Sequence, residues 1–292
     1  MFKGSIVPLI TPFTKQNKVD HKALYELVEW HVAEGTDGII CLGTTGEAPT
    51  LDHKERTLVV KTCQKAIKGR IPLIVGTGTY NTAESVAFTE LVKEMKVDAA
   101  MAIVPYYNKP TPRGCLEHFR AISKVGLPVM LYHHPGRTGL KLSTPLFLQM
   151  IKEKIIHAIK DCSWDYEQMK EILREFKIPI MSGDNEELIT TIKLGGTGGV
   201  CTAPNVIPKE WKEITALALK KDFAAAEKKV KELDELLKGI QLEGNPGPIK
   251  YLVHLIGKCE PNLRLPMVMP EEKTRKTLHD YLLKRGLLPS LI

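Results

Sequence analysis

The sequence predicts an α/β fold, a (β/α)8 (TIM) barrel followed by a C-terminal helical extension. Short apolar runs alternate with longer segments of helical periodicity, at intervals of roughly 20 to 35 residues. The runs are nearly continuously apolar, which is typical of parallel strands covered on both faces. Eight such units within about 210 residues match a closed barrel. An open doubly wound sheet is the alternative, but no G-x-G-x-x-G motif follows the first run.

The apolar runs and the segments between them give the elements in chain order. We expect strands within residues 4–10, 38–43, 72–78, 99–105, 128–133, 155–161, 178–184 and 198–203. The first helical segment places the apolar residues of Leu24–Val32 on one face, and Gly35 is its expected C-cap. Asp52 and either Ser143 or Thr144 are expected to cap the starts of later helices.

The C-terminal part of the chain differs from the rest. Residues 208–290 have helical patterns only, with breaks at residues 243–250 and 260–270. The first of these helices is expected to complete the barrel. We therefore predict a catalytic barrel domain over residues 1–225 and a helical extension over residues 226–292.

The composition is that of an ordinary globular protein. The chain has 292 residues, of which 43% are hydrophobic and 26% charged. The net charge of +7 is spread over mixed helical segments, which does not indicate a nucleic-acid surface. Six cysteines without a C-x-x-C pair predict free thiols in a reducing compartment. Because no signal-peptide pattern and no apolar run of membrane length is present, we expect a cytoplasmic protein.

Polar residues gather where the predicted strands end. In a barrel of this type the active site lies at the C-terminal ends of the strands. The strand ends carry Gly43-Thr44-Thr45-Gly46-Glu47, Pro105-Tyr106-Tyr107-Asn108, residues 132–139, Lys160-Asp161 and Ser182-Gly183-Asp184. We expect these residues to converge on one mouth of the barrel.

Lys160 is the strongest candidate for a catalytic group. It closes an apolar strand, and loss of water around its ammonium would lower its pKa toward neutrality. A neutral amine can attack a ketone and form a Schiff base. The alternative is a lysine that extends to solvent. Tyr132 and Tyr107 offer phenols for the proton transfers of such chemistry, with the hydroxyl of Thr44 between them, unless both tyrosines only line the wall.

The Gly-Thr-Thr-Gly turn and Arg137 are candidate anion sites. Backbone N–H groups and the hydroxyls of Thr44 and Thr45 suit a small carboxylate, whereas a tight turn alone would explain only the glycines. The guanidinium of Arg137 could take a second carboxylate, although a surface arginine is equally compatible with the sequence. His133 and His134 are adjacent and point to opposite faces of a strand, so we expect no metal site.

Several motifs together resemble the dihydrodipicolinate synthase and N-acetylneuraminate lyase superfamily. These are "GIICLGTTGEAPTLDHKE", "YHHPGRTG" followed by "AIKDC", "PYYNKPTPRG", "SGDN", "NPGPIK" and "LRLPM". The resemblance extends over essentially the whole chain. It implies a class I pyruvate-dependent aldolase that needs no cofactor beyond the covalent imine.

The resemblance also implies roles for individual residues. Lys160 would form the imine with pyruvate, Tyr132 would be the general acid and base, and Thr44 and Tyr107 would complete a proton relay. Tyr107 would be supplied across a dimer interface, within a homotetramer built as a dimer of dimers. The carboxylate of pyruvate would bind the two threonines. The remaining substrate-binding residues would be Arg137, for the carboxylate of the second substrate, with Gly183 and the backbone of Val200 lining the site.

The arginine selects one branch of the superfamily. Its P-x-R-T-G context resembles the dihydrodipicolinate synthase branch, which condenses pyruvate with L-aspartate 4-semialdehyde to 4-hydroxy-tetrahydrodipicolinate in lysine and diaminopimelate synthesis. His134 stands where an aliphatic residue is common in the family, and Ala158 replaces a usual glycine.

A lysine-effector site is also implied, at His53, Arg56, Tyr80, Glu84 and Tyr106. His53, Glu84 and Tyr106 match the lysine-sensitive pattern. Arg56 would place a fixed cation near the ammonium of the ligand, and Tyr80 adds bulk, so we expect weak or absent inhibition by lysine.

Two other functions remain open from the sequence. One is another pyruvate aldolase or lyase of the superfamily that acts on a sugar acid or a hydroxy-oxo acid. The other is a non-catalytic barrel that binds a carboxylate ligand.

Overall fold

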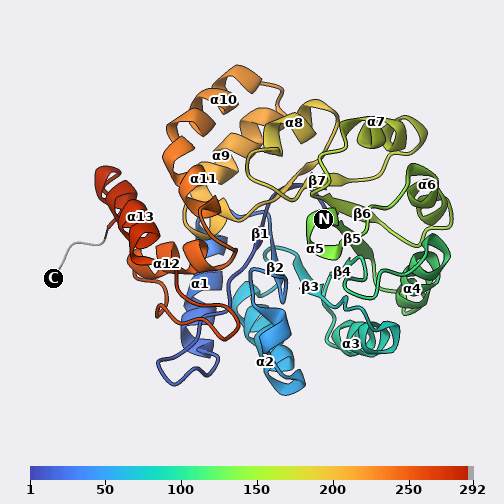
Figure 1. The fold of residues 1–292 in the computed structure, drawn as a ribbon, viewed down its shortest axis with the longest axis horizontal. Helices are drawn as coiled ribbons and strands as arrows, with labels where there is room; N and C mark the ends of the chain where they lie inside the picture. Colours follow the sequence, from blue (N-terminus) through green and yellow to red (C-terminus); the bar gives the residue numbers. More distant parts are fainter. Residues whose placement is uncertain (289–292) are drawn as a thin grey trace.

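The computed structural model confirms the barrel. It describes residues 1–288; residues 289–292, the end of the predicted extension, lie outside the described residues. Eight parallel strands close in chain order, and β8 pairs back with β1 (Figure 1). The strands are β1 (Gly4–Pro8), β2 (Gly38–Cys41), β3 (Leu73–Gly76), β4 (Ala99–Ile103), β5 (Val129–His133), β6 (Ala158–Asp161), β7 (Ile180–Ser182) and β8 (Gly198–Val200). Each lies within a predicted apolar run, and the residues left over at the C-terminal ends form loops.

Helices surround the barrel as a ring (Figure 1). They are α1 (His21–Ala33), α2 (His53–Ile67), α3 (Thr82–Glu94), α4 (Pro112–Lys124), α6 (Thr144–Lys152), α7 (Tyr166–Glu175), α8 (Leu188–Lys193) and α9 (Pro208–Leu219). A short helix α5 (Pro135–Thr138) and two 3₁₀ turns, η1 (Ala48–Thr50) and η2 (Ala203–Asn205), follow strand ends. Asp52 caps α2 in a reciprocal capping box with Glu55, as expected from the sequence. Ser143 precedes α6 at the N-cap position without a side-chain hydrogen bond.

Four more helices form the C-terminal part of the chain: α10 (Phe223–Glu232), α11 (Asp234–Gln241), α12 (Gly247–Leu255) and α13 (Glu272–Lys284). The break expected over residues 243–250 is partly wrong, because α12 already begins at Gly247. Pro248 lies in its first turn, where a missing N–H costs nothing. The boundary expected between residues 225 and 226 falls inside α10. No helix within residues 1–288 combines the length and the apolar character needed to cross a membrane.

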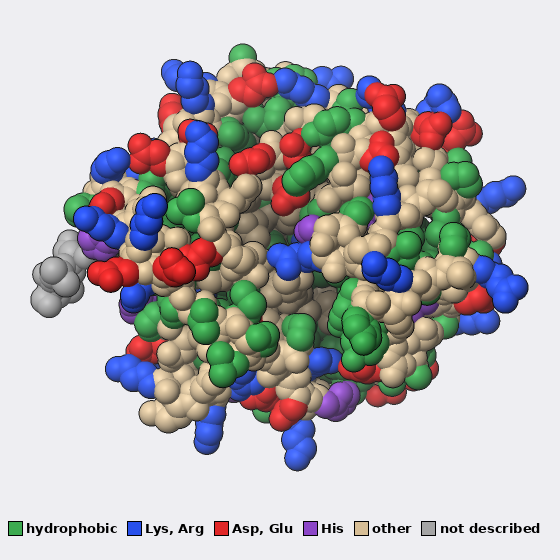
Figure 2. Space-filling model, in the orientation of Figure 1, with side chains coloured by type: hydrophobic (Ala, Val, Ile, Leu, Met, Phe, Trp, Pro, Cys, Tyr) green, Lys and Arg blue, Asp and Glu red, His purple; other side chains and the backbone are tan. Residues whose placement is uncertain are grey.

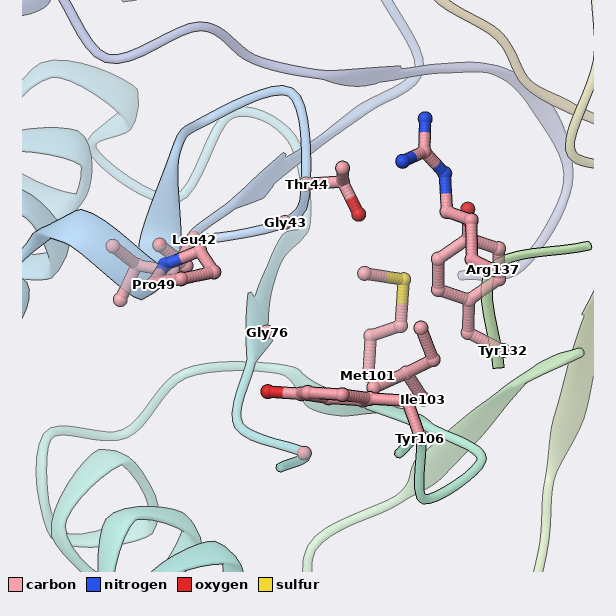
Figure 3. Close-up of a pocket in the computed structure, with 12 residues that line it drawn as sticks. Leu42, Gly43, Thr44, Pro49, Gly76, Met101, Ile103, Tyr106, Tyr132 and Arg137 are labelled. Atoms are coloured by element: carbon pink, nitrogen blue, oxygen red, sulfur yellow. The ribbon is translucent and has the colours of Figure 1, made fainter. Parts of the chain in front are cut away.

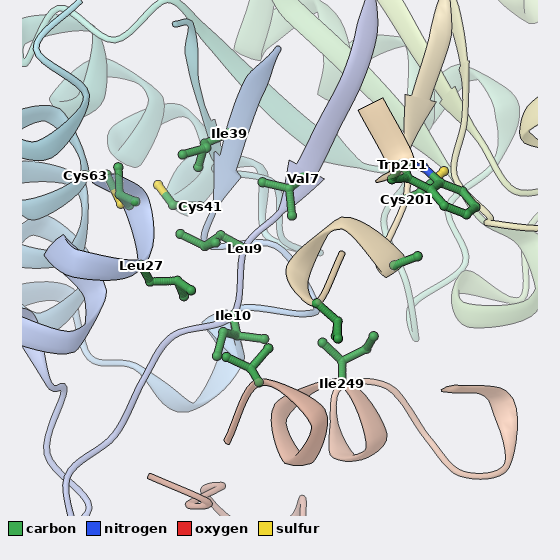
Figure 4. Close-up of a cluster of buried hydrophobic side chains, with 14 of the residues drawn as sticks. Val7, Leu9, Ile10, Leu27, Ile39, Cys41, Cys63, Cys201, Trp211 and Ile249 are labelled. Carbon is green, nitrogen blue, oxygen red and sulfur yellow. The ribbon is translucent and has the colours of Figure 1, made fainter. Parts of the chain in front are cut away.

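The alternation of side chains along each strand separates two kinds of core. Inward-facing residues fill the barrel itself; they include Ile6, Ile40, Ile74, Met101, Met130, Ala158, Met181 and Val200. Their neighbours in sequence point outward and pack against the helices, as Val7 and Ile39 do in Figure 4. Tyr132 and Lys160 lie two residues beyond Met130 and Ala158. They therefore continue the inward-facing rows to the C-terminal end of the barrel.

Candidate active site

Lys160 and Tyr132 lie side by side at the end of the barrel interior. They are register partners on β6 and β5, and the Lys160 Nζ lies 4.1 Å from the centre of the Tyr132 ring. Both side chains are buried, with exposed fractions of 6% and 5%. Burial lowers the pKa of Lys160, and nearby thiol and carboxylate groups oppose that shift only in part. Burial also raises the pKa of Tyr132 well above its usual value, so its phenol stays protonated at neutral pH.

The turn after β2 forms the next wall of the site. Its own hydrogen bonds use the backbone N–H groups of Gly46 and Glu47, which donate to the carbonyls of Gly43 and Thr44 at 3.1 and 3.0 Å. Within residues 1–288, the backbone N–H groups of Thr44 and Thr45 donate to no protein acceptor. These two amides and the Thr44 hydroxyl remain available for an anion.

Side chains from several parts of the chain hold this turn in place. The Thr11 hydroxyl donates to the Gly46 carbonyl at 2.7 Å, and Asn245 Nδ2 donates to Thr45 Oγ1 at 3.0 Å. Glu47 adopts a left-handed conformation with φ of 52°, which sends its carboxylate away from the cavity to the buried ammonium of Lys250. Asn245 and Lys250 belong to the C-terminal part of the chain, so that part takes a direct share in shaping the turn.

Two adjoining cavities open over these residues, and both are lined by Thr44, Tyr132 and Arg137. The larger has a volume of about 360 Å³ and also contains Lys160, Thr45 and Gly183 in its lining. The smaller has a volume of about 210 Å³. In Figure 3 the Thr44 hydroxyl points into the space in front of Tyr132 and Arg137. The space-filling view in Figure 2 shows the surface hollowed in its central region, over the barrel.

The short helix α5 carries Arg137 and begins at Pro135, and its N-cap is His134, the residue directly after β5. His134 Nδ1 accepts a hydrogen bond from the backbone N–H of Arg137 at 3.3 Å, so this ring nitrogen is unprotonated. Burial, and then the charge of Arg137, lower the pKa of His134. His133 turns the other way: its Nδ1 lies 3.0 Å from Asp161 Oδ1, and its Nε2 accepts from the Leu142 N–H at 3.1 Å. The two histidines therefore lie in different environments and, in the described part of the chain, share no hydrogen-bond partner.

Two residues predicted for the site do not reach the cavity in this chain. Tyr107 is 87% exposed and is absent from the lining of both cavities among the described residues. Its neighbour Tyr106 lines the smaller cavity, with its hydroxyl directed away from Tyr132 (Figure 3). Val200 lies in the barrel interior as a fully buried side chain, in the same cluster as Tyr132, but is likewise not part of the lining.

Four residues of the predicted effector site, Arg56, Tyr80, Glu84 and Tyr106, lie close to one another. Arg56 Nη1 is 3.3 Å from Glu84 Oε1, and the rings of Tyr80 and Tyr106 meet edge to face at 5.2 Å. Burial raises the pKa of Tyr106, and the nearby Tyr80, Glu84 and Arg56 also affect it. His53 packs against Phe88, one helical turn after Glu84.

Several lining residues were not selected from the sequence. They are Asn245 and Glu243 in the segment before α12, and Cys162, Trp164 and Asp184 in the loops after β6 and β7. Asp184 was visible as part of a strand end, but nothing in the pattern distinguished Trp164 or Glu243. Within residues 1–288, no three His, Cys, Asp or Glu side chains are grouped as a metal site would require.

A barrel with a buried lysine, a phenol and an anion-binding turn at its C-terminal mouth is the architecture of a (β/α)8-barrel enzyme. The model of the Dihydrodipicolinate synthetase family matches residues 1–285. The chain belongs to this family.

Individual relatives agree closely in sequence and structure. The 4-hydroxy-tetrahydrodipicolinate synthase of Thermodesulfovibrio yellowstonii is 38% identical over 291 residues, which cover 99% of this chain and 100% of the relative. The crystal structure of dihydrodipicolinate synthase from Aquifex aeolicus matches with a TM-score of 0.96 and 37% identity, covering 99% of both chains. The chloride-inhibited dihydrodipicolinate synthase from Acinetobacter baumannii, solved in complex with pyruvate, matches with a TM-score of 0.95 and 36% identity, covering 99% of this chain and 100% of that one.

Proposed function

We propose that this protein is a lyase that condenses pyruvate with L-aspartate 4-semialdehyde to give 4-hydroxy-tetrahydrodipicolinate, in lysine and diaminopimelate synthesis. The observation that carries the proposal is the buried pair of Lys160 and Tyr132 beside an anion-binding turn, in a chain of this family. Full-length relatives bear the name of this synthase, and one was solved with pyruvate.

Lys160 is the proposed nucleophile. Because burial lowers the pKa of its ammonium, a larger share of the side chain is the neutral amine that can attack the ketone carbon of pyruvate. The amine and the ketone form a carbinolamine, which loses water to give the iminium ion. Loss of a methyl proton then gives the enamine, whose carbon attacks the aldehyde of the second substrate. The amino group of the aldehyde substrate then attacks the iminium carbon, closes the ring and displaces the Lys160 amine. One water is lost overall, from the carbinolamine, and no further cofactor takes part.

Tyr132 is the proposed general acid and base. Its phenol is protonated at neutral pH and lies against the amine, so it can donate the proton that turns the carbinolamine hydroxyl into water. We propose that Thr44 passes this proton on and that Tyr107 of a partner subunit completes the relay. The exposure of Tyr107 in a single chain supports a partner-supplied role, which requires at least a dimer. A homotetramer built as a dimer of dimers is proposed from the resemblance to the family alone.

The two anion sites are proposed to hold the two substrates. Thr44 and Thr45 would bind the carboxylate of pyruvate through their free amides and the Thr44 hydroxyl. Arg137, on the opposite side of the cavity, would bind the carboxylate of the aldehyde substrate, and Gly183 lines the same cavity. The proposed part of Val200 is limited to its backbone, because its side chain is buried in the barrel and does not line the cavity.

The direct test is to trap the imine. The protein is incubated with pyruvate, reduced with borohydride and digested, and the modified peptide is located by mass spectrometry. We expect a pyruvate-derived adduct on Lys160 that is absent from a Lys160→Ala variant. A folded protein that traps no pyruvate would refute the proposal. A trapped adduct with no turnover of L-aspartate 4-semialdehyde would point to another pyruvate aldolase.

Weak or absent inhibition by lysine is a further proposal. Arg56 already lies within ion-pair distance of Glu84, and Tyr80 fills space against Tyr106, so a bound lysine would meet a paired carboxylate and a competing cation. Half-inhibition at micromolar lysine would contradict this. An Arg56→Ala variant frees Glu84, and we expect it to be more sensitive to lysine than the wild type.

Two organisational features are also proposed. Six free cysteines suit a reducing compartment, which supports a cytoplasmic location. We keep the division into a catalytic barrel over residues 1–225 and a helical extension over residues 226–292 as a proposal.

A further inference from the structure

Trp164 is an unusual residue for the position that it occupies. It lies in the loop between β6 and α7, four residues after Lys160, and lines the larger cavity. Its side chain is 62% exposed, and its φ of 57° lies in the left-handed region, where a bulky residue is an outlier. A large apolar side chain held in a disfavoured conformation over a cavity indicates a function in that cavity.

The surrounding loop fixes this conformation. The Ser163 hydroxyl donates to Asp161 Oδ2 at 2.9 Å and accepts from the Asp165 N–H at 3.3 Å. Asp165 in turn accepts from the Gln168 N–H at 2.9 Å, as the N-cap of α7. The residues on both sides of Trp164 are therefore held by β6 and α7.

The indole ring is held as well. Its Nε1–H donates to Asp184 Oδ2 at 2.9 Å, which links the loop after β6 to the loop after β7. The backbone of Asp184 is itself anchored, because its carbonyl accepts from the Ser182 hydroxyl at 2.8 Å and from the Cys201 thiol at 3.2 Å. The indole is therefore held in the cavity lining by a hydrogen bond, although it is largely exposed to solvent.

The position of the Trp164 indole in the larger cavity indicates which of the two substrates it would contact. Lys160 and Thr45 are buried parts of the cavity lining, with exposed fractions of 6% and 3%, and pyruvate is proposed to be held beside them. Arg137, His134 and Trp164 line the same cavity but are less buried, so the aldehyde, which binds after pyruvate, is proposed to lie against them. If Lys160 and Arg137 hold the two ends of an aldehyde that carries a carboxylate, an indole in the lining of the same cavity can limit the length and width of that aldehyde.

We propose that Trp164 is a specificity-determining residue that restricts the acceptor to short aldehydes bearing a carboxylate. This inference rests on the proposed condensation. On this proposal a four-carbon aldehyde is accepted, and longer chains are excluded because their additional carbons would need the space that the indole occupies.

The test compares straight aldehydes with a terminal carboxylate: succinic semialdehyde, 5-oxopentanoate and 6-oxohexanoate, with four, five and six carbons. The value of kcat/KM is measured for each, at saturating pyruvate, in the wild type and in Trp164→Gly. Glycine accepts the positive φ without strain, so this variant is expected to fold. We expect the ratio for the six-carbon to the four-carbon aldehyde to rise about tenfold or more in the glycine variant.

Trp164→Phe is the matched control, because it keeps an aromatic wall but has no N–H for Asp184. We expect it to keep the wild-type order of the three aldehydes. Tryptophan emission gives a readout besides activity: addition of succinic semialdehyde to the pyruvate-loaded protein should change the emission of the wild type and not that of Trp164→Phe, in which Trp30 and Trp211 remain.

The outcomes separate this inference from the proposed reaction. If no pyruvate adduct forms on Lys160 in the wild type, the proposed reaction fails. If the adduct forms but Trp164→Gly keeps the wild-type length preference, or loses all three aldehydes equally, the assignment of Trp164 is overturned while the reaction stands. Equal loss of length preference in the phenylalanine and glycine variants would also overturn it.

Discussion

Removal of the buried cation at Lys250 should weaken both the fold and the binding of pyruvate. The side chains of Lys250 and Glu47 form an ion pair with exposed fractions of 0% and 1%. The other Glu47 oxygen accepts from the Arg264 N–H at 3.0 Å, and the Lys250 Nζ lies 4.0 Å from the centre of the Phe13 ring. A Lys250→Met variant keeps much of the volume but leaves the Glu47 carboxylate buried without its cation.

The size of the effect follows from that unpaired charge. Breaking a buried ion pair on one side costs roughly 3–5 kcal/mol, against a total stability of about 5–15 kcal/mol for a typical domain. At about 2–4 °C per kcal/mol, the melting temperature should fall by roughly 6–20 °C. The Glu47→Gln/Lys250→Met double variant removes both charges and keeps an acceptor for the Arg264 N–H, so we expect it to be more stable than Lys250→Met alone.

The assay combines thermal unfolding with trapping of the pyruvate imine over a range of pyruvate concentrations. Because Glu47 lies two residues after Thr45 and donates its backbone N–H to the Thr44 carbonyl, we expect the pyruvate concentration for half-saturation to rise in Lys250→Met. Lys238→Met is the control: it removes an exposed pair with Asp234, which contributes about 0–1 kcal/mol. The reasoning is wrong if Lys250→Met melts within about 2 °C of the wild type, or if the double variant is less stable than the single one.

Two further predictions concern the barrel and the buried histidines. A Cβ at Gly183 would lie 2.1 Å from the Cys162 thiol and 3.0 Å from the Lys160 Cε, so Gly183→Ala should abolish imine trapping. Gly247→Ala is the control and should trap the imine normally, because the nearest atom to its Cβ lies at 3.5 Å. Equal trapping in both variants would contradict this prediction. Burial lowers the pKa of His31 to about 3 and of His118 to about 4. Between about pH 6.5 and pH 4 the unfolded chain therefore binds protons that the folded chain does not, and the free energy of unfolding decreases as the pH is lowered. From pH 7 to pH 5 each histidine should cost about 2 kcal/mol, and His118→Phe should remove its share of the loss in denaturant titrations; an unchanged loss would show that His118 is not the group responsible.

The strands and the positions of Lys160 and Tyr132 could be predicted because they follow from local patterns. An apolar run of strand length that ends in Lys160 places that lysine at the mouth of any closed parallel barrel. The inward direction of Tyr132 follows from the two-residue period that it shares with Met130.

The support of the turn could not be predicted, because it depends on pairs far apart in the chain. Asn245 and Thr45 are separated by 200 positions, and Lys250 and Glu47 by 203. In a helical sequence pattern, a lysine that forms a buried ion pair cannot be distinguished from a lysine that is exposed to solvent. The conformation of Trp164 could not be predicted for a related reason: its positive φ depends on the hydrogen bonds of the neighbouring residues and not on the residue itself.

These long-range contacts make the C-terminal helices part of the site. Asn245 holds Thr45, Lys250 holds Glu47, and Arg264 forms a two-pronged pair with Glu55 on α2 at 2.6 Å for each bond, while donating to the Thr50 carbonyl. A ligand that fixes the Thr44–Thr45 turn should therefore stabilise the packing of α12 against it. Stable packing of α12 should in turn raise the affinity for that ligand, because a coupling free energy acts equally in both directions. If this turn holds the carboxylate of pyruvate as proposed, the C-terminal part of the chain contributes to the binding of the first substrate through Asn245 and Lys250, without supplying a reacting group.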